Sequence, residues 1–82
     1  MSTLAYFDSL QGLIPIRILA VGDWSDSNSI ARVQFTATRG PWKRGAVESW
    51  PLRRIVPRTA VYRRGGSTYI RGYNWELMRQ KD

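Results

Sequence analysis

The chain has 82 residues, a formal net charge of +7 and 43% hydrophobic residues, which is enough apolar material for an ordered domain. A chain of this length buries only about 60 to 65% of the surface that its unfolded form exposes, so it has room for one hydrophobic core. Cysteine and histidine are absent, which excludes disulfides, thiolate or imidazole metal sites and imidazole catalysis. We therefore expect a single domain that is not an enzyme and has no catalytic residues, cofactor or metal.

The charge is divided unevenly along the chain. Through Ala31 there are one basic and three acidic residues, whereas from Arg32 onward there are twelve basic and three acidic residues. Eleven of the thirteen basic residues are arginine, which forms forked contacts with phosphate and stacks on aromatic rings better than lysine does. Because a one-sided positive surface attracts polyanions, the second half of the chain is the expected working surface.

Nothing in the sequence predicts a membrane protein. The longest apolar stretch, from Leu13 to Val21, is about half the length needed to cross a bilayer. Residues 1–12 lack the basic start and the continuous apolar stretch of a secretory signal. We therefore expect a cytoplasmic protein, in the host cytoplasm if it is viral, with no membrane partner.

Residues 1–12 open the chain with a helix-like spacing of apolar side chains. Leu4, Phe7 and Leu10 are three residues apart and precede Gly12, which predicts one or two turns of helix ending at the glycine. An extended arm is the alternative, and in either form the segment would cover an open end of the domain.

Three elements are expected next, between residues 13 and 38. The apolar, β-branched run at 13–21 predicts a strand. Residues 22–29 are rich in aspartate, asparagine and serine, which favour a loop. From Ile30 to Thr38 apolar and polar residues alternate, which predicts a half-buried strand.

The remainder of the chain predicts short strands joined by glycine and proline turns. Residues 39–45 form an expected turn and residues 46–50 a returning strand. Pro51 and Pro57 bracket a segment that suits a short bent or edge strand, since proline denies the ladder one N–H.

Two β-rich runs, 59–63 and 67–71, flank Gly65-Gly66 and predict a hairpin. Asn74 can cap a short helix through Gln80, whose Trp75 and Met78 would dock on the barrel. The single domain, residues 1–82, is thus expected to have an arm or short helix at 1–12, a β-barrel at 13–72 and a helical turn or tail at 73–82.

Residues 33–61, VQFTATRGPWKRGAVESWPLRRIVPRTAV, resemble the middle of a small basic SH3-like barrel, similar in style to the retroviral integrase C-terminal domain and to KOW-type modules. In those domains a strand, a basic glycine-containing turn, a returning strand and a VPR-like segment follow in this order. The expected fold class is therefore mainly β, as an SH3-like, partly open barrel of five to six short strands with short helical turns at both ends.

The turn at 39–45 is the first candidate binding site, because Trp42 lies among Arg39, Lys43 and Arg44. An exposed Trp would stack on bases while the cations neutralise phosphates. In the alternative, Trp42 folds inward as a plug of the barrel end and the three cations are only solvated.

A cluster of five arginines within twelve residues is the second candidate, with Tyr62 as a further stacking residue. The arginines are Arg53, Arg54, Arg58, Arg63 and Arg64. Since side chains alternate between the faces of a strand, Arg53 and Arg54 share one patch only if a bend at a proline intervenes. The functional interpretation is a track for a phosphate backbone or an acidic protein surface, and the alternative is a solvated face.

Two further tryptophans, Trp24 and Trp50, are candidate interface anchors, because tryptophan is enriched at binding hot spots. Packing against the barrel is the alternative for both. Asp23 and Asp26 lack the spacing of a calcium loop, so no metal is expected there.

These features favour a nucleic-acid-binding module for DNA or RNA with low sequence specificity, using an Arg-rich face and exposed Trp or Tyr side chains. One alternative is a small adaptor or inhibitor, encoded by a virus such as a phage or by a mobile element, that engages an acidic host protein. Another is a structural or assembly component whose barrel edges pair with neighbours, and the oligomeric state is open in each case.

Overall fold

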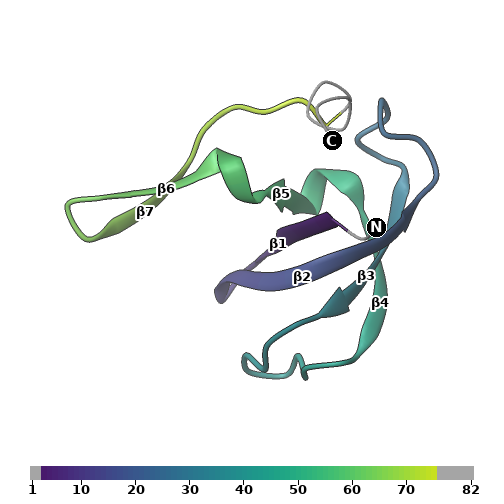
Figure 1. Cartoon of the computed structure of the whole chain (residues 1–82), viewed down its shortest axis with the longest axis horizontal. Coiled ribbons are helices and arrows are strands. Elements are labelled where there is room, and N and C mark those ends of the chain that lie inside the picture. The colour runs from purple at the N-terminus through teal and green to yellow at the C-terminus, as the bar shows by residue number, and fades with distance from the viewer. Residues whose placement is uncertain (1–2, 76–82) are drawn as a thin grey trace.

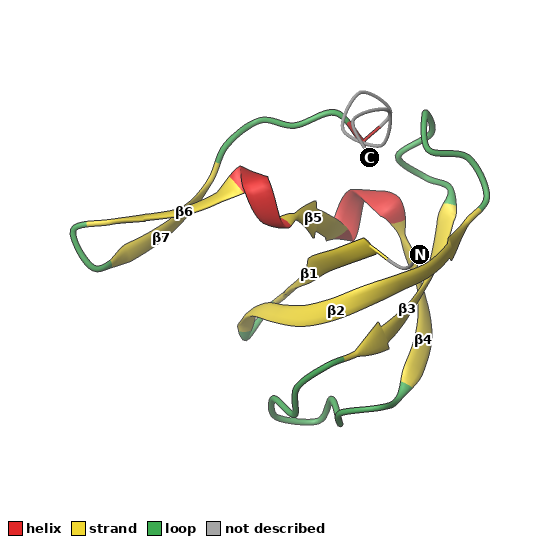
Figure 2. Cartoon of the chain, viewed as in Figure 1, coloured by secondary structure: helices red, strands yellow, loops and turns green. Residues whose placement is uncertain are grey.

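The structure, a computed structural model, describes residues 3–75, which form seven strands and two single 3-10 turns (Figures 1 and 2). The elements are β1 (Thr3–Ser9), β2 (Gly12–Val21), β3 (Ile30–Phe35), β4 (Val47–Pro51), η1 (Leu52–Arg54), β5 (Ile55–Pro57), η2 (Arg58–Ala60), β6 (Val61–Arg64) and β7 (Ser67–Ile70). Within this range no helix has the length and apolar composition needed to cross a membrane. The expectation of a mainly β fold is confirmed.

Five strands form one antiparallel sheet in the order β4-β3-β2-β1-β5, and β6 and β7 form a separate hairpin. The long strand β2 pairs with β1 and with β3, and its register with β3 shifts between Ile18 and Ala20. Strands β4 and β5 are the two edges of the sheet, so it curves around its core without closing into a barrel (Figure 1).

The core is built from the alternating residues of the first three strands together with the segment that follows β4. The largest fully buried side chains are Phe7, Phe35, Ile14, Ile16, Leu52, Ile55, Val33 and Val56. Burial of each such side chain contributes about 1.5–3 kcal/mol relative to leaving it exposed. The alternation predicted for 30–38 places Ala31, Val33 and Phe35 inward, whereas Ala37, beyond the end of β3, is only partly buried.

The predicted N-terminal helix is wrong, because residues 3–9 form strand β1. Ala5 and Phe7 are buried, whereas Leu10 is fully exposed, so the buried positions follow a period of two. Pairing with β2 on one side and β5 on the other satisfies the backbone of β1. That tertiary pairing overrides the local helical spacing. The expected C-terminal helix falls mostly on residues 76–82, outside the described residues.

The third strand is shorter than predicted. It ends at Phe35 instead of Thr38, where two residues of the returning segment oppose Phe35: the Gly45 N–H donates to the Phe35 carbonyl at 2.8 Å and the Phe35 N–H donates to the Ala46 carbonyl at 3.0 Å. Both bonds close the base of a wide loop that contains the predicted turn. The returning strand after this loop is confirmed as β4.

The glycine turn between β6 and β7 follows its prediction closely. Gly65 and Gly66 have φ angles of 59° and 83°, in the left-handed region that a two-residue type I′ hairpin turn requires at both positions. The edge strand predicted between the two prolines is present as β5, preceded by the single turn η1.

Candidate functional site

Trp42 in the basic turn is directed inward. Its ring meets Phe7 edge to face at 5.6 Å between centroids and lies 6.4 Å from the ring of Phe35. The Arg39 and Trp42 backbones exchange two hydrogen bonds of 2.8 and 2.9 Å, which hold the turn closed. Trp42 is thus partly buried against the core, as in the inward alternative, and the cations of this turn, Arg39, Lys43 and Arg44, are exposed.

The two adjacent arginines of η1 diverge. Arg54 donates hydrogen bonds from Nε and Nη2 to the Asp8 carbonyl at 3.1 and 2.9 Å. Its guanidinium lies over the rings of Phe7 and Trp50, at 5.5 and 5.6 Å from their centroids. Arg53 extends to the loop at 22–29 instead, where Nη1 donates to an amide oxygen at 2.6 Å. Arg54 therefore contacts the sheet, and Arg53 and Arg54 do not form one basic patch.

The two tryptophans proposed as anchors also pack within the domain. The Trp50 ring lies 4.5 Å from that of Phe7, and its Nε1 donates to Glu48 at 2.9 Å. The Trp24 ring lies 5.3 Å from that of Trp75, at an interplanar angle of 52°. Both are partly buried against the core, so packing accounts for much of their surface.

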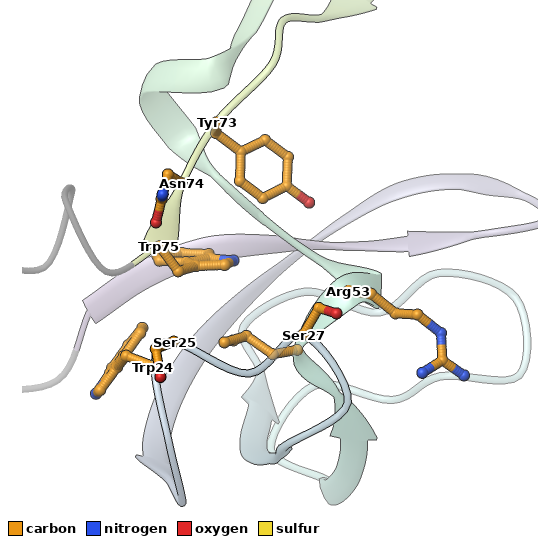
Figure 3. Close-up of a pocket in the computed structure, with 8 residues that line it drawn as sticks. Trp24, Ser25, Ser27, Arg53, Tyr73, Asn74 and Trp75 are labelled. Atoms are coloured by element: carbon orange, nitrogen blue, oxygen red, sulfur yellow. The ribbon is translucent and has the colours of Figure 1, made fainter.

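A cavity of about 380 Å³ opens between the loop at 22–29, η1 and residues 73–75 (Figure 3). Aromatic, apolar, polar and basic side chains all contribute to its wall: Trp24, Ser25, Ser27, Leu52, Arg53, Tyr73, Asn74 and Trp75. In Figure 3 the guanidinium of Arg53 points away from the aromatic side of the cavity. Of this set, only Trp24 and Arg53 were predicted from the sequence as binding residues, while Asn74 and Trp75 were expected in a C-terminal helix.

Residues 73–75 are fixed by one backbone carbonyl of β5. The Tyr73 hydroxyl and the Trp75 Nε1 both donate to the carbonyl oxygen of Ile55, at 3.1 and 2.8 Å. Burial, aided by the negative charge of Asp8, raises the pKa of the Tyr73 hydroxyl above its ordinary value. On the loop opposite, hydrogen bonds from Ser25 lower the pKa of the Asp23 carboxyl.

The hairpin of β6 and β7 projects away from the sheet (Figure 1). Seven of its eight strand residues are exposed, and only Val61 is partly buried. At its base, the Arg71 N–H donates to the Ala60 carbonyl at 2.8 Å. The hairpin therefore offers both faces to a binding partner, in contrast to the turn at 39–45.

One face of this hairpin combines rings and cations. Tyr62 pairs directly with Tyr69, and their rings stack at 5.5 Å with an angle of 24°. The Arg71 guanidinium lies over the Tyr62 ring at 4.9 Å from its centroid. Alternation places Arg64 on the same face, one position nearer the tip, while Arg63 lies on the opposite face.

Two residues of this face, Tyr69 and Arg71, were missed by sequence reasoning. The information to find Tyr69 was present, because a two-residue turn at Gly65-Gly66 pairs residue 62 with residue 69. The contact of Arg71 with Tyr62 depends on the twist of the ribbon and on rotamers, which the sequence does not specify.

The basic groups named from the sequence do not merge into one surface. The loop containing residues 39–45 and the β6–β7 hairpin lie at well-separated places in Figure 1. Arg58 is exposed at the start of η2, where it borders a small hollow beside β1. Among the predicted residues, the structure brings together Tyr62, Arg63 and Arg64 on one ribbon, with Arg58 at its base.

Within residues 3–75, no group of three or more His, Cys, Asp or Glu residues is placed to hold a metal ion. Comparisons of the chain with protein-family models, with curated proteins and with solved structures find no significant match. The functional argument therefore depends on the geometry of the hairpin and its surroundings.

Proposed function

We propose that this protein binds nucleic acid with low sequence specificity, and that the β6–β7 hairpin is its principal contact. The observation that carries the proposal is an exposed ribbon with a stacked tyrosine pair among arginines. The sequence between Glu48 and Glu76 contains six arginines and no acidic residue. Positive charge beside exposed rings suits a phosphate backbone and its bases.

The isolation of the hairpin is a second argument for a partner. A two-stranded hairpin on its own is marginally stable in water, because it has no sheet or helix to cover a face. This hairpin exposes Tyr62, Tyr69 and Ile70, by 37, 46 and 42% respectively. A bound polyanion would cover the rings and neutralise Arg63 and Arg64.

We also propose that the five-stranded sheet is a half-closed SH3-like barrel. The strand order β4-β3-β2-β1-β5 and the single 3-10 turn between β4 and β5 support this assignment. The projecting hairpin is then an addition after the last barrel strand. Its position at the end of β5 and η2 gives it room to reach a long polymer (Figure 1).

The test is the salt dependence of binding to a labelled oligonucleotide, measured by fluorescence anisotropy. Each lost phosphate contact reduces the slope of log affinity against log salt by about 0.7 for single strands or 0.9 for duplex. Arg63→Ala with Arg64→Ala should therefore flatten the slope by about 1.4 to 1.8.

The matched control is Arg17→Ala with Arg32→Ala. It removes the same charge from exposed positions of β2 and β3, on the sheet instead of the hairpin. The control should change the slope by much less. Equal slopes for both double variants would contradict the assignment to the hairpin, and failure of the wild-type protein to bind any oligonucleotide at low salt would refute the proposed function.

A second candidate, binding of a protein partner, is favoured by the cavity beside Tyr73 and Trp75. Its aromatic wall and volume suit an apolar side chain from a partner. A stoichiometric complex with one protein, lost on Ser27→Glu at the exposed rim of the cavity while the fold is retained, together with no oligonucleotide binding, would select this function.

A further inference from the structure

The two stacked tyrosine rings of the hairpin differ in how much of each is covered by neighbouring groups. Tyr62 has two neighbours, the Tyr69 ring and the Arg71 guanidinium. Tyr69 stacks on Tyr62 and is 46% exposed, and within residues 3–75 no cation lies over its ring. Arg71, Tyr62 and Tyr69 therefore form a short stack that is open at Tyr69.

A cation is available close to this open position. Arg64 follows Tyr62 by two residues on β6, on the same face and roughly 7 Å farther toward the tip. It is paired with Ser67, which lies on the same face of β7 two residues before Tyr69. Arg64 is exposed, so it can reach a phosphate next to a group stacked on Tyr69.

This arrangement discriminates between forms of nucleic acid. In a duplex the faces of the bases are covered by their neighbours, so a ring on a protein surface meets mainly sugar and phosphate. Unpaired bases expose a face that stacks on an aromatic side chain, with little dependence on which base it is.

We infer that the Tyr62–Tyr69 face of the hairpin binds single-stranded nucleic acid, with an unpaired base stacked on Tyr69 and its phosphate on Arg64. The inference rests on the nucleic-acid binding proposed above and narrows it to unpaired strands. Stacking supplies the preference for single strands over duplex, while the arginines supply the salt-dependent part of the affinity that both forms share.

The experiment compares oligothymidylate, oligouridylate and a DNA duplex as labelled probes for the full chain, by anisotropy at low salt. Wild type should bind the single strands more tightly than the duplex. Tyr69→Leu keeps a bulky side chain that is compatible with the hairpin but has no aromatic face. It should weaken single-strand binding by about 5- to 150-fold, the range for one stacked base. Its effect on duplex binding should be much smaller.

Two further variants separate stacking from folding. Tyr69→Trp restores an aromatic face and should retain the wild-type preference for single strands. Ile70→Ala changes the neighbouring residue, which is 42% exposed on the opposite face, and should leave single-strand affinity within about twofold of wild type.

The possible results are distinguishable. Equal loss for Tyr69→Leu and Ile70→Ala, or tighter binding of duplex than of single strands by wild type, would overturn the inference and leave the proposed nucleic-acid function standing. Absence of binding to all three probes would refute the proposed function, and the inference with it. A difference between oligothymidylate and oligouridylate would show a contribution of the sugar or of the thymine methyl group, and tight binding of either supports the inference.

Discussion

Arg53 and Arg54 are adjacent in sequence, yet their guanidinium groups have different surroundings. Arg54 satisfies a carbonyl of β1 and covers the rings of Phe7 and Trp50, whereas Arg53 reaches Asn28 on an exposed loop. Strand alternation predicted that they diverge, but both lie in the 3-10 turn η1, so their divergence does not come from a strand. The sequence does not indicate that Arg54 would stabilise the sheet, because Phe7 and Asp8 of β1 are more than 40 residues away along the chain.

Replacement of Arg54 by alanine should destabilise the fold. It removes two charge-assisted hydrogen bonds to the Asp8 carbonyl and the cover over two rings, and hydrogen bonds to charged groups contribute about 1.5–3 kcal/mol when well made. Because Arg54 is only partly buried, we expect a loss of about 1–2 kcal/mol in the free energy of unfolding. Urea unfolding followed by tryptophan fluorescence measures it.

The neighbouring substitution, Arg53→Ala, is the control for the loss of one positive charge. Its side chain is exposed, so we expect a change of no more than about 0.5 kcal/mol. If Arg54→Ala were as mild as this control, the contacts with Asp8 and the rings would not be stabilising.

At the scale of elements, the β6–β7 hairpin is largely independent of the sheet. Its turn and register follow from two glycines and the alternation on either side of them. Its exposed residues bury little surface, and its ends are joined at the base by the hydrogen bond from Arg71 to Ala60. The hairpin therefore contributes little to the stability of the sheet.

Excision of the hairpin should therefore separate folding from binding. When residues 61–70 are replaced by two glycines, Ala60 and Arg71 remain close enough to be joined by a tight turn. We expect cooperative unfolding with a free energy within about 1 kcal/mol of wild type, because mostly exposed residues are removed. Oligonucleotide affinity should fall below that of the Arg63→Ala, Arg64→Ala variant. Retention of wild-type affinity would assign binding to another surface.

At the scale of the whole molecule, the segment after the hairpin returns to the core. Trp75 is buried to 7% exposure, and both Tyr73 and Trp75 donate to the Ile55 carbonyl. These contacts connect residues 73–75 to the edge strand β5 and complete one wall of the cavity. Stability of the molecule is thus coupled to the protonation of the Tyr73 hydroxyl.

The coupling predicts a loss of stability at alkaline pH. Burial favours the neutral hydroxyl, so the pKa of Tyr73 in the folded protein is raised above its ordinary value of 10.0. Between these two values the unfolded chain binds fewer protons than the native protein, and the free energy of unfolding falls as the pH rises. Tyr73→Phe keeps the ring but cannot ionise. Its stability should therefore approach that of wild type, or exceed it, as the pH increases beyond 10.0.

Urea titrations of the two proteins across the alkaline range measure this effect, and the difference between them separates Tyr73 from the other tyrosines. A constant difference from neutral to alkaline pH would show that the hydroxyl ionises as readily in the folded protein as in the unfolded chain.

Local sequence patterns are enough to predict several of the strands. Alternation set the inward residues of β3, apolar β-branched content set β2, and paired glycines set the β6–β7 turn. The excess of arginine in the second half is also known from the sequence, because it depends only on composition.

Features that depend on contacts between distant segments could not be predicted from local sequence. Residues 3–9 are a strand because β2 and β5 satisfy both of their edges, and Trp42 is inward because Phe7 and Phe35 lie beneath the turn. The same reason applies to the candidate site. The charge was visible in sequence, but its division between the sheet, the turn and a projecting hairpin depended on how the strands pair.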